Sequence, residues 1–223
     1  MIIHQTWKTK DIPYNIFPKE WVDSWIKNHP GCDYRLWSDE DNRDLIKSHY
    51  PKFLGLYDSY DSGIKRADIV RYFILHKFGG LYIDLDCVST QNFSEFLEDK
   101  DLAIGIEPEI NSSTLYNNRA ILSNALMYSK PGHPFWVYVF RQAIKHQKIN
   151  NSPVFETGPI LLTDAYDEYV KNGGKAFLLD RNAFLWNDKP FSTGNIATMK
   201  FKDNRICDEK TFVIHVNVAV WSR

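Results

Sequence analysis

The chain has 223 residues, of which 43% are hydrophobic and 25% are charged. This length and composition fit one α/β or α+β domain with a substantial core, and we expect residues 1–223 to form a single domain. A formal net charge of -1 argues against a nucleic-acid partner. No apolar run approaches the ~20 residues that cross a bilayer, and no signal peptide precedes the first predicted strand. We therefore expect a soluble, cytoplasmic protein with no integral membrane segment, although a domain cut from a longer chain would look the same.

The N-terminal part of the chain predicts alternating strands and helices. The first seven residues, MIIHQTW, are typical of the first strand of a parallel sheet. Ligands of open α/β sheets bind beyond the carboxyl ends of strands, so the end of this strand is placed to meet one with Gln5, Thr6 and Trp7. The next predicted elements are a helix over 18–28, a strand over 34–37, a helix from Ser38 to about residue 48 with a capping box to Asp41, and a helical piece from Pro51.

The stretch 61–87 carries the most specific pattern in the chain. It predicts a helix that is apolar around nearly its whole circumference and stops at Gly79-Gly80. Asp68 and Arg71 lie inside this helix on one face, where polar side chains cost free energy unless they are partnered. The possible caps of the helix are Asp61 and Ser62.

A strand over 81–86 is predicted after the two glycines. Its carboxylates, Asp84 and Asp86, fall at i and i+2 and would therefore project from the same side of the strand. Two neighbouring acids at the end of a strand favour a divalent cation site, because hard cations prefer oxygen ligands.

The C-terminal part predicts further helices and strands. Helices are expected over 93–99, 134–147 and 160–170, and strands over 102–106, 175–179 and 211–216. Thr157-Gly158-Pro159 introduces the last of these helices, with its proline in the tolerated first turn. The segment 119–128 fits a strand or a helix, and 111–118 and 181–210 are expected to be irregular.

Several segments, taken in their order along the chain, resemble one protein family. They are Ile3-His4-Gln5-Thr6-Trp7, Leu36-Trp37-Ser38-Asp39-Glu40, Arg66-Ala67-Asp68-Ile69-Val70-Arg71-Tyr72, the segment from Gly79 to Asp86, Thr157-Gly158-Pro159, His215 and Trp221. This order resembles the DXD sugar-binding glycosyltransferases, which include the fungal initiating α-1,6-mannosyltransferase, bacterial capsule transferases and large-virus relatives. Their core is similar to that of the clostridial glucosylating toxins. The central helix, Gly-Gly and Asp-x-Asp make the resemblance specific, whereas a bare Asp-x-Asp would be weak.

The resemblance implies a fold, a reaction and a set of partners. The fold is α/β of the GT-A type, a single Rossmann-like catalytic domain with a mixed, mainly parallel central sheet flanked by helices. The reaction is metal-dependent transfer of a hexose, with retention of configuration, from a nucleotide-sugar donor to a glycan or glycoprotein acceptor. UDP-hexose is the first choice of donor because of the toxin-like core, and GDP-mannose is the second because of the fungal relatives.

The chemistry of such a donor assigns expected roles. A nucleotide sugar carries two negative charges on its diphosphate, and cleavage of the sugar–phosphate bond adds charge that a divalent ion and a guanidinium can offset. The expected metal ligands are Asp84, Asp86, and His215 or Asn217, and an imidazole among oxygens favours Mn²⁺ over Mg²⁺. Expected donor-binding residues are Gln5, Thr6, Trp7, Asp68, Arg71 and Asp84, and the resemblance to the family implies that Tyr82 also lies near the donor. Asp84, Asp86 and Arg71 are the expected catalytic residues, and Thr157 and Gly158 are assigned to an acceptor or sugar pocket.

Several of these residues would equally suit a structural role. Asp68 and Arg71 are compatible with a buried structural ion pair, and Trp7 and His215 are compatible with the core. Two further functions also remain open: a metal-dependent phosphohydrolase or nucleotidyltransferase, and a non-catalytic module that binds sugar nucleotides. The first would need further acids or a glycine-rich phosphate loop, and the chain has no Walker-type or aspartyl-phosphate motif.

Overall fold

The computed structural model describes residues 1–107, 120–147, 151–179, 184–186, 211–216 and 218. Its main sheet has six strands in the order β2-β1-β3-β6-β5-β7. Three of its five strand pairings are parallel, β1 with β2, β1 with β3 and β5 with β7, and β6 runs antiparallel to both of its neighbours. These strands are β1 (Ile2–Thr6), β2 (Asp33–Trp37), β3 (Gly80–Ile83), β5 (Leu102–Ile106), β6 (Leu122–Ser129) and β7 (Phe177–Leu179). The predicted mixed, mainly parallel α/β sheet is confirmed.

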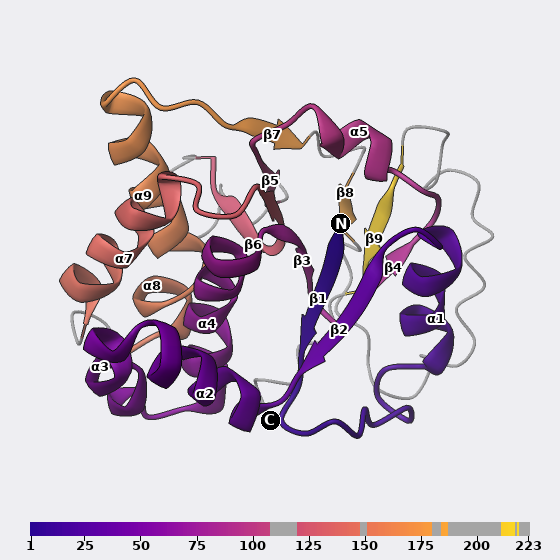
Figure 1. The fold of residues 1–223 in the computed structure, drawn as a ribbon, viewed down its shortest axis with the longest axis horizontal. Coiled ribbons are helices and arrows are strands. Elements are labelled where there is room, and N and C mark those ends of the chain that lie inside the picture. Colours follow the sequence, from indigo (N-terminus) through magenta and orange to yellow (C-terminus); the bar gives the residue numbers. More distant parts are fainter. Residues whose placement is uncertain (108–119, 148–150, 180–183, 187–210, 217, 219–223) are drawn as a thin grey trace.

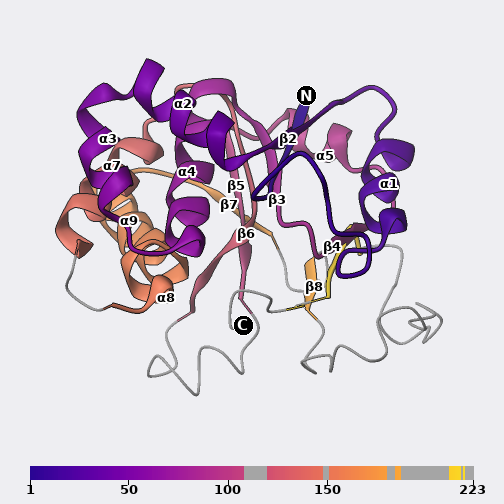
Figure 2. The same cartoon turned by 90° about the horizontal axis from the view of Figure 1, so that it is seen from below.

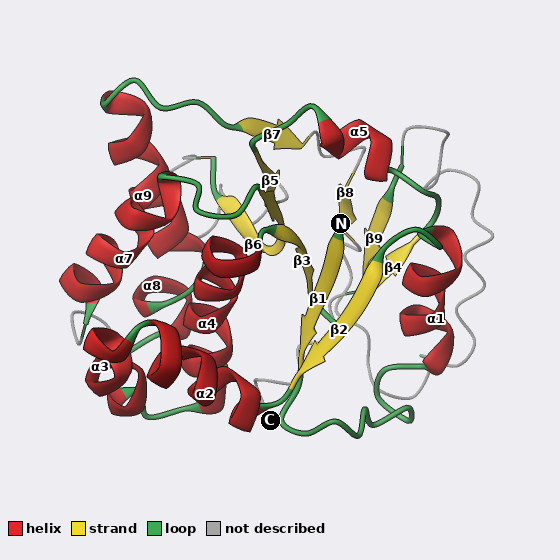
Figure 3. Ribbon diagram, in the orientation of Figure 1, coloured by secondary structure: helices red, strands yellow, loops and turns green. Residues whose placement is uncertain are grey.

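Helices cover both faces of the main sheet (Figures 1 and 2). On one side lie α2 (Asp39–His49), α3 (Leu54–Ser59), α4 (Gly63–Phe78), α7 (Phe135–His146), α8 (Pro153–Glu156) and α9 (Pro159–Lys171). On the other side lie α1 (Lys19–Asn28), α5 (Ser94–Glu98) and a small sheet of β4 (Cys87–Ser89), β9 (Val213–His215) and β8 (Phe184–Trp186). A 3₁₀ turn, η1 (Pro51–Phe53), precedes α3. Figure 3 shows the same arrangement with the helices in red and the strands in yellow. Among the described residues, none of the helices combines the length and apolar character needed to cross a membrane.

The alternation of side chains along β3 divides the core into two layers. Leu81 and Ile83 belong to the core that includes Trp25 of α1. Tyr82, between them, belongs to the core formed with α4 and α7. Because successive side chains of a strand point to opposite faces, β3 is covered on both sides and its polar groups can emerge only beyond its carboxyl end.

Local sequence signals set the starts of several helices. Ser38 caps α2, and the reciprocal capping box with Asp41 is present, as predicted. Pro159 occupies the first turn of α9, also as predicted. Of the two possible caps of α4, Ser62 stands at the N-cap position but makes no side-chain cap hydrogen bond, and the Asp61 carboxylate pairs with Lys65 at 2.9 Å.

Three other predictions need correction or completion. The strand predicted over 81–86 ends at Ile83, so Asp84 and Asp86 lie in the turn that leads to β4 rather than on one face of a strand. The ambiguous segment 119–128 forms β6, and β8 lies within the segment predicted to be irregular. Residues 111–118 and the remainder of 181–210 lie outside the described residues.

Two glycines set the junction between α4 and β3. Gly79 and Gly80 have φ of 62° and 90°, a backbone region that residues with a Cβ rarely adopt. A Cβ on Gly80 would lie 2.3 Å from the carbonyl oxygen of Ile2 in β1. The close approach of β1 and β3 therefore depends on the absence of a side chain at this position.

We expect Gly80→Ala to destabilise the protein by roughly 3 kcal/mol or more, because it adds a clash with β1 to the conformational strain. Gly132→Ala is the matched control. Gly132 also has a positive φ, of 72°, but a Cβ added there would have no atom within 4 Å. The control should lose only about 1–2 kcal/mol. Urea denaturation measures both, and equal losses would contradict the proposed clash.

His4 joins three elements inside the core. Its Nε2 lies 2.9 Å from the carbonyl oxygen of Gly79, and the Trp37 indole donates to its Nδ1 at 3.1 Å. Since Nδ1 accepts, Nε2 carries the proton and the ring is neutral. Burial lowers the pKa of His4 from 6.5 to about 4. The residue therefore has a structural role, consistent with its complete burial.

The lowered pKa of His4 predicts a loss of stability in acid. An unfolded chain binds the proton near pH 6.5 and the folded chain only near pH 4, so folding stability should fall as the pH drops through this window. The expected loss from this group is about 3 kcal/mol. The test is to measure denaturation curves of the protein and of His4→Gln at pH 7 and pH 4. The variant has no imidazole at this position, so its free energy of unfolding should lose less on acidification. The same pH dependence in both proteins would refute the assignment.

Candidate functional site

The centre of the site is the guanidinium of Arg71, which bridges two carboxylates. Its Nη2 lies 2.9 Å from Oδ1 of Asp68, and its Nη1 lies 3.2 Å from Oδ1 of Asp84. Asp68 lies one turn earlier in α4, whereas Asp84 follows β3. Arg71 is only 3% exposed, so both ion pairs form in a largely desolvated setting where they are strong.

The protein itself holds Arg71 in place. Its Nε donates to the carbonyl of Ala67 at 3.2 Å, and Nη1 also donates to the carbonyl of Asn124 in β6 at 2.8 Å. The guanidinium carbon lies 4.6 Å from the centroid of the Tyr82 ring, within cation–π range. The charge is therefore oriented before any ligand arrives.

A short hydrogen-bond chain runs from β1 to the turn after β3. The Tyr82 hydroxyl donates to Oδ1 of Asp84 at 3.0 Å and lies 3.0 Å from the hydroxyl of Thr6. Since the single phenol proton goes to Asp84, Thr6 donates to Tyr82. Burial raises the pKa of Tyr82 well above its ordinary value, so the phenol keeps its proton.

Gln5 fixes the backbone of the same turn. Its Nε2 donates to the carbonyl of Asp84 at 3.1 Å, and its Oε1 accepts from the Tyr34 hydroxyl at 2.6 Å. The side chain of Gln5 is fully buried. What the structure shows is that Gln5 holds the backbone of the acidic turn through the Asp84 carbonyl. Direct contact between Gln5 and a donor stays a prediction.

Asp68 faces groups from two further elements. Asn124 donates to its Oδ1 at 3.0 Å, and the Thr157 hydroxyl donates to its Oδ2 at 3.3 Å. Burial raises the pKa of Asp68 to about 6, against the opposing effect of Arg71. Thr157 and Gly158 were both expected in an acceptor or sugar pocket. Thr157 lies beside Asp68, and the carbonyl of Gly158 lies 3.5 Å from the hydroxyl of Tyr72. Asn124 was missed in the sequence, where the only signal was an amide inside an apolar stretch.

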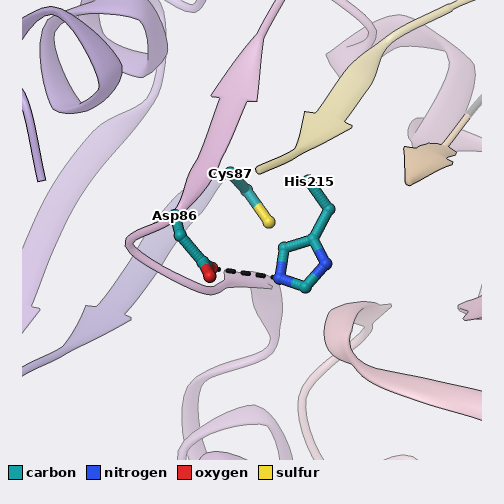
Figure 4. A group of neighbouring side chains, drawn as sticks. All are labelled: Asp86, Cys87 and His215. Carbon is teal, nitrogen blue, oxygen red and sulfur yellow. Dashed lines mark hydrogen bonds and ion pairs between the residues drawn. The ribbon is translucent and has the colours of Figure 1, made fainter. Parts of the chain in front are cut away.

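A second group lies where the turn meets the end of the chain (Figure 4). The Nε2 of His215 donates to Oδ1 of Asp86 at 3.0 Å, and the backbone N–H of Val218 donates to Oδ2 of Asp86 at 2.9 Å. Cys87 is the cross-strand partner of His215, and one possible ligand atom of each of the three residues lies within 4.8 Å of the others. Residues 129 positions apart in the sequence therefore converge on one point.

The charges of this second group support each other. Burial opposes ionisation of Asp86, but the His215 imidazole and the hydrogen bonds around the carboxylate outweigh it and lower the pKa of Asp86. Burial also disfavours the charged form of His215, yet the neighbouring Asp86 raises the pKa of His215. Burial raises the pKa of Asp84, with Arg71 opposing.

The donor set of the second group fits a divalent cation. Nε2 of His215 and Oδ1 of Asp86 lie 3.0 Å apart, and a carboxylate oxygen and an imidazole nitrogen are ligand types that suit Mn²⁺. Binding of the ion would displace the proton that Nε2 donates to Asp86. Asp86 and His215 would hold the ion, and Asp84 lies two residues away with its side chain 29% exposed. Asn217, the other expected ligand, lies outside the described residues.

Trp7 lies at the same edge of the sheet. It is half-buried and packs edge-on against Phe17, with ring centroids 5.1 Å apart. It also packs against the small core that contains Leu85 and Val216, the neighbours of the acidic turn and of His215. Trp7 from the N-terminal part of the chain and Val216 from the C-terminal part therefore lie in one cluster at this edge, while stacking of Trp7 on a base stays a prediction.

Comparison with solved structures defines the class of fold. The chain resembles the PaToxG glycosyltransferase with a TM-score of 0.54 and 18% identity, over 77% of this chain and 69% of that one. It resembles the galactosyltransferase LgtC with a TM-score of 0.53 and 13% identity, over 96% of this chain and 86% of that one. The fold is that of the GT-A glycosyltransferases.

Sequence comparison identifies the family. Residues 18–103 match the glycosyltransferase sugar-binding region containing the DXD motif. Inositol phosphoceramide mannosyltransferase 3 of Schizosaccharomyces pombe is 37% identical over 76% of this chain and 45% of its own length. Mannosyl phosphorylinositol ceramide synthase CSH1 of Saccharomyces cerevisiae is 33% identical over 92% of this chain and 56% of its own length. Glycosyltransferase L373 of Acanthamoeba polyphaga mimivirus is 30% identical over 84% of this chain and 75% of its own length.

The chain therefore belongs to the family of glycosyltransferases with a DXD sugar-binding region, as its motifs suggested. It spans about half the length of the yeast relatives that it matches. Asp84-Leu85-Asp86, the Asp-x-Asp expected to be the motif, lies within the matched range. The structure pairs Asp84 with Arg71 and Asp86 with His215.

Loss of the Arg71 charge should destabilise the protein strongly. Arg71→Met leaves Asp68 and Asp84 without their cationic partner, and breaking a buried ion pair in this way costs about 3–5 kcal/mol. The control is Arg43→Met, which breaks an exposed ion pair with Asp58 and should cost about 1 kcal/mol or less. Urea denaturation at pH 7 measures both, and a loss below 1 kcal/mol for Arg71→Met would contradict the bridging role.

Proposed function

We propose that this chain is the catalytic domain of a metal-dependent, retaining mannosyltransferase that uses a nucleoside diphosphate mannose. The observation that carries the proposal is the buried Arg71, held between Asp68 and Asp84 at the edge of the sheet where Asp86 meets His215. Membership of the DXD family supports glycosyl transfer. The names of two yeast relatives specify mannose, which favours GDP-mannose, the second of the two donors that the sequence suggested, over a UDP-hexose.

The residues of the first group would bind the charged and hydroxylated parts of the donor. Arg71 would offset the charge that grows on the diphosphate as the sugar–phosphate bond breaks, at little reorganisation cost because the guanidinium is already fixed. Asp68 would accept hydrogen bonds from sugar hydroxyls, and Tyr82 would keep the Asp84 carboxylate oriented. Thr6 and Trp7 would meet the base, and Thr157 and Gly158 would border the sugar.

The residues of the second group would hold Mn²⁺ or Mg²⁺. A divalent cation supplies Lewis-acid stabilisation of the diphosphate leaving group when it is bound. Asp86 would bind it directly with His215 from β9, and Asn217 remains a candidate ligand. Asp84 would bind through water or hold hydroxyls of the donor. No residue is assigned as a nucleophile, because the departing phosphate can itself accept the proton of the acceptor hydroxyl.

The acceptor that we propose is the inositol headgroup of a phosphoinositol sphingolipid. The support is the identity of 37% and 33% to proteins whose names specify inositol phosphoceramide or its mannosylated product. A glycan or glycoprotein, the acceptor expected from the sequence, is the alternative. Outside Asp86, Cys87 and His215, the described residues contain no further group of three metal-ligating side chains, so a phosphohydrolase with additional acids gains no support.

The metal and the donor can be tested by binding. We expect Mn²⁺ to bind, and GDP-mannose to bind in its presence, as followed by electron paramagnetic resonance and calorimetry. Asp86→Asn should weaken Mn²⁺ binding by more than the roughly 10- to 100-fold that loss of an outer-shell partner costs. Asp101→Asn, at an exposed residue at the other end of the sheet, is the control. Unchanged Mn²⁺ affinity in Asp86→Asn would overturn the metal assignment.

The reaction can be tested with radiolabelled GDP-mannose and UDP-glucose. We expect Mn²⁺-dependent transfer of mannose to inositol phosphoceramide in detergent micelles, with slow hydrolysis of GDP-mannose when no acceptor is present. Transfer to a glycoprotein alone would replace the proposed acceptor. Donor binding without hydrolysis or transfer would favour the non-catalytic module.

A further inference from the structure

One face of α4 contacts a short segment that lies beside the proposed sugar subsite. Lys65, Asp68 and Tyr72 recur at i, i+3 and i+7, a spacing that places them on the same face of a helix. Each of the three contacts the segment 151–158, which contains α8. The segment is thus attached to the helix that carries Arg71.

Lys65 is a buried cation at this contact. It is 3% exposed, and its Nζ lies 2.7 Å from Oε2 of Glu156, 2.9 Å from Oδ1 of Asp61 and 2.6 Å from Oδ1 of Asn151. An ammonium group has three donors, so these three acceptors use all of them. Lys65 therefore has no donor left for a substrate, and its charge is used inside the protein.

The carboxylate partner of Lys65 stands next to a residue of the site. Glu156 is 5% exposed and directly precedes Thr157. The Thr157 hydroxyl lies 3.3 Å from Oδ2 of Asp68 and 3.2 Å from the carbonyl oxygen of Pro153, so these two acceptors share its single proton. The Tyr72 hydroxyl donates to the carbonyl of Thr157 at 2.9 Å. A shift of Glu156 would therefore move the hydroxyl that contacts Asp68.

Packing from the other side completes the hold on the segment. Nδ1 of His146, at the end of α7, lies 2.8 Å from the carbonyl of Phe155, and its Nε2 lies 3.1 Å from a carboxylate oxygen of Asp164 in α9. α8 itself is a single turn of four residues without a side-chain cap. So short a helix has little stability of its own, and its position depends on these contacts.

We propose that the buried Lys65–Glu156 ion pair is a positioning device for the monosaccharide end of the donor site. It holds Thr157 against Asp68, and so sets the carboxylate that meets the sugar, while the nucleotide end near Thr6 and Trp7 does not depend on it. The proposal rests on the proposed function. A buried ion pair often stabilises a fold no better than apolar side chains of similar volume, so a purely stabilising role predicts a different result from a positioning role.

The test compares two ligands on one variant. Lys65→Met/Glu156→Leu removes both charges together, which avoids the unpaired Glu156 carboxylate that Lys65→Met alone would leave. Calorimetry in Mn²⁺ then gives the Kd of GDP and of GDP-mannose. We expect the Kd of GDP to change less than about 2-fold and the preference for GDP-mannose over GDP to fall by about 10-fold, the effect of one charge-assisted hydrogen bond.

Two further proteins make the outcome decisive. Lys130→Met/Asp101→Leu removes an exposed ion pair at the opposite end of β6 and should leave both Kd values unchanged. If the buried double variant does not fold, as judged by circular dichroism, Glu156→Gln is measured instead, with a smaller change in the same direction expected. Steady-state kinetics should show a higher KM for the donor in the variant that folds.

Each result separates the two levels of the hypothesis. If the unmodified protein binds GDP-mannose and the variant keeps the same preference over GDP, the positioning role is wrong and the pair is only structural. The same conclusion follows if both ligands weaken equally. If the unmodified protein binds neither ligand in Mn²⁺, the proposed function falls and the positioning role falls with it.

Discussion

The structure depends on one buried cation, the guanidinium of Arg71. It lies between Asp68 of its own helix and Asp84 beyond β3, and it donates to the backbone of β6. A charge in this position is tolerable only because two carboxylates and two backbone carbonyls surround it. The same contacts bring α4, β3 and β6 together at one edge of the sheet, so the interaction that stabilises the fold also builds the site.

A second interaction brings the end of the chain to this edge. His215 of β9 donates to Asp86, and the backbone N–H groups of Val216 and Val218 donate to the carbonyl and the carboxylate of the same residue. The small sheet thereby closes over the turn after β3. The acidic pair of the DXD motif is divided between two partners, Arg71 for Asp84 and His215 for Asp86. This division suits a site in which one carboxylate faces the donor and the other faces a cation.

Local signals predicted the elements well and the site in part. The capping box at Ser38, the proline of α9 and the spacing of Asp68 and Arg71 act over three or four residues, and the structure confirms them. The strand over 81–86 failed because β3 stops at Ile83, where the chain turns toward β4. Asn124, Tyr72 and the Lys65–Glu156 pair were not predicted as a group, since nothing in a sequence reports which distant segments will touch.

The sequence by itself determined the mixed α/β class, the buried helix with its glycine stop, and the family of the chain, because periodicity, caps and contiguous motifs depend on near neighbours. The family resemblance placed Asp86 and His215 in one expected metal site, but only the tertiary structure shows that they contact each other directly across 129 positions. It alone decided that Thr157 lies against Asp68 across 89 positions. These contacts are made by the packing of α4 and the turn after β3 against segments far along the chain. The burial that results from this packing raises the pKa of Asp68 to about 6, an effect that no local sequence pattern encodes.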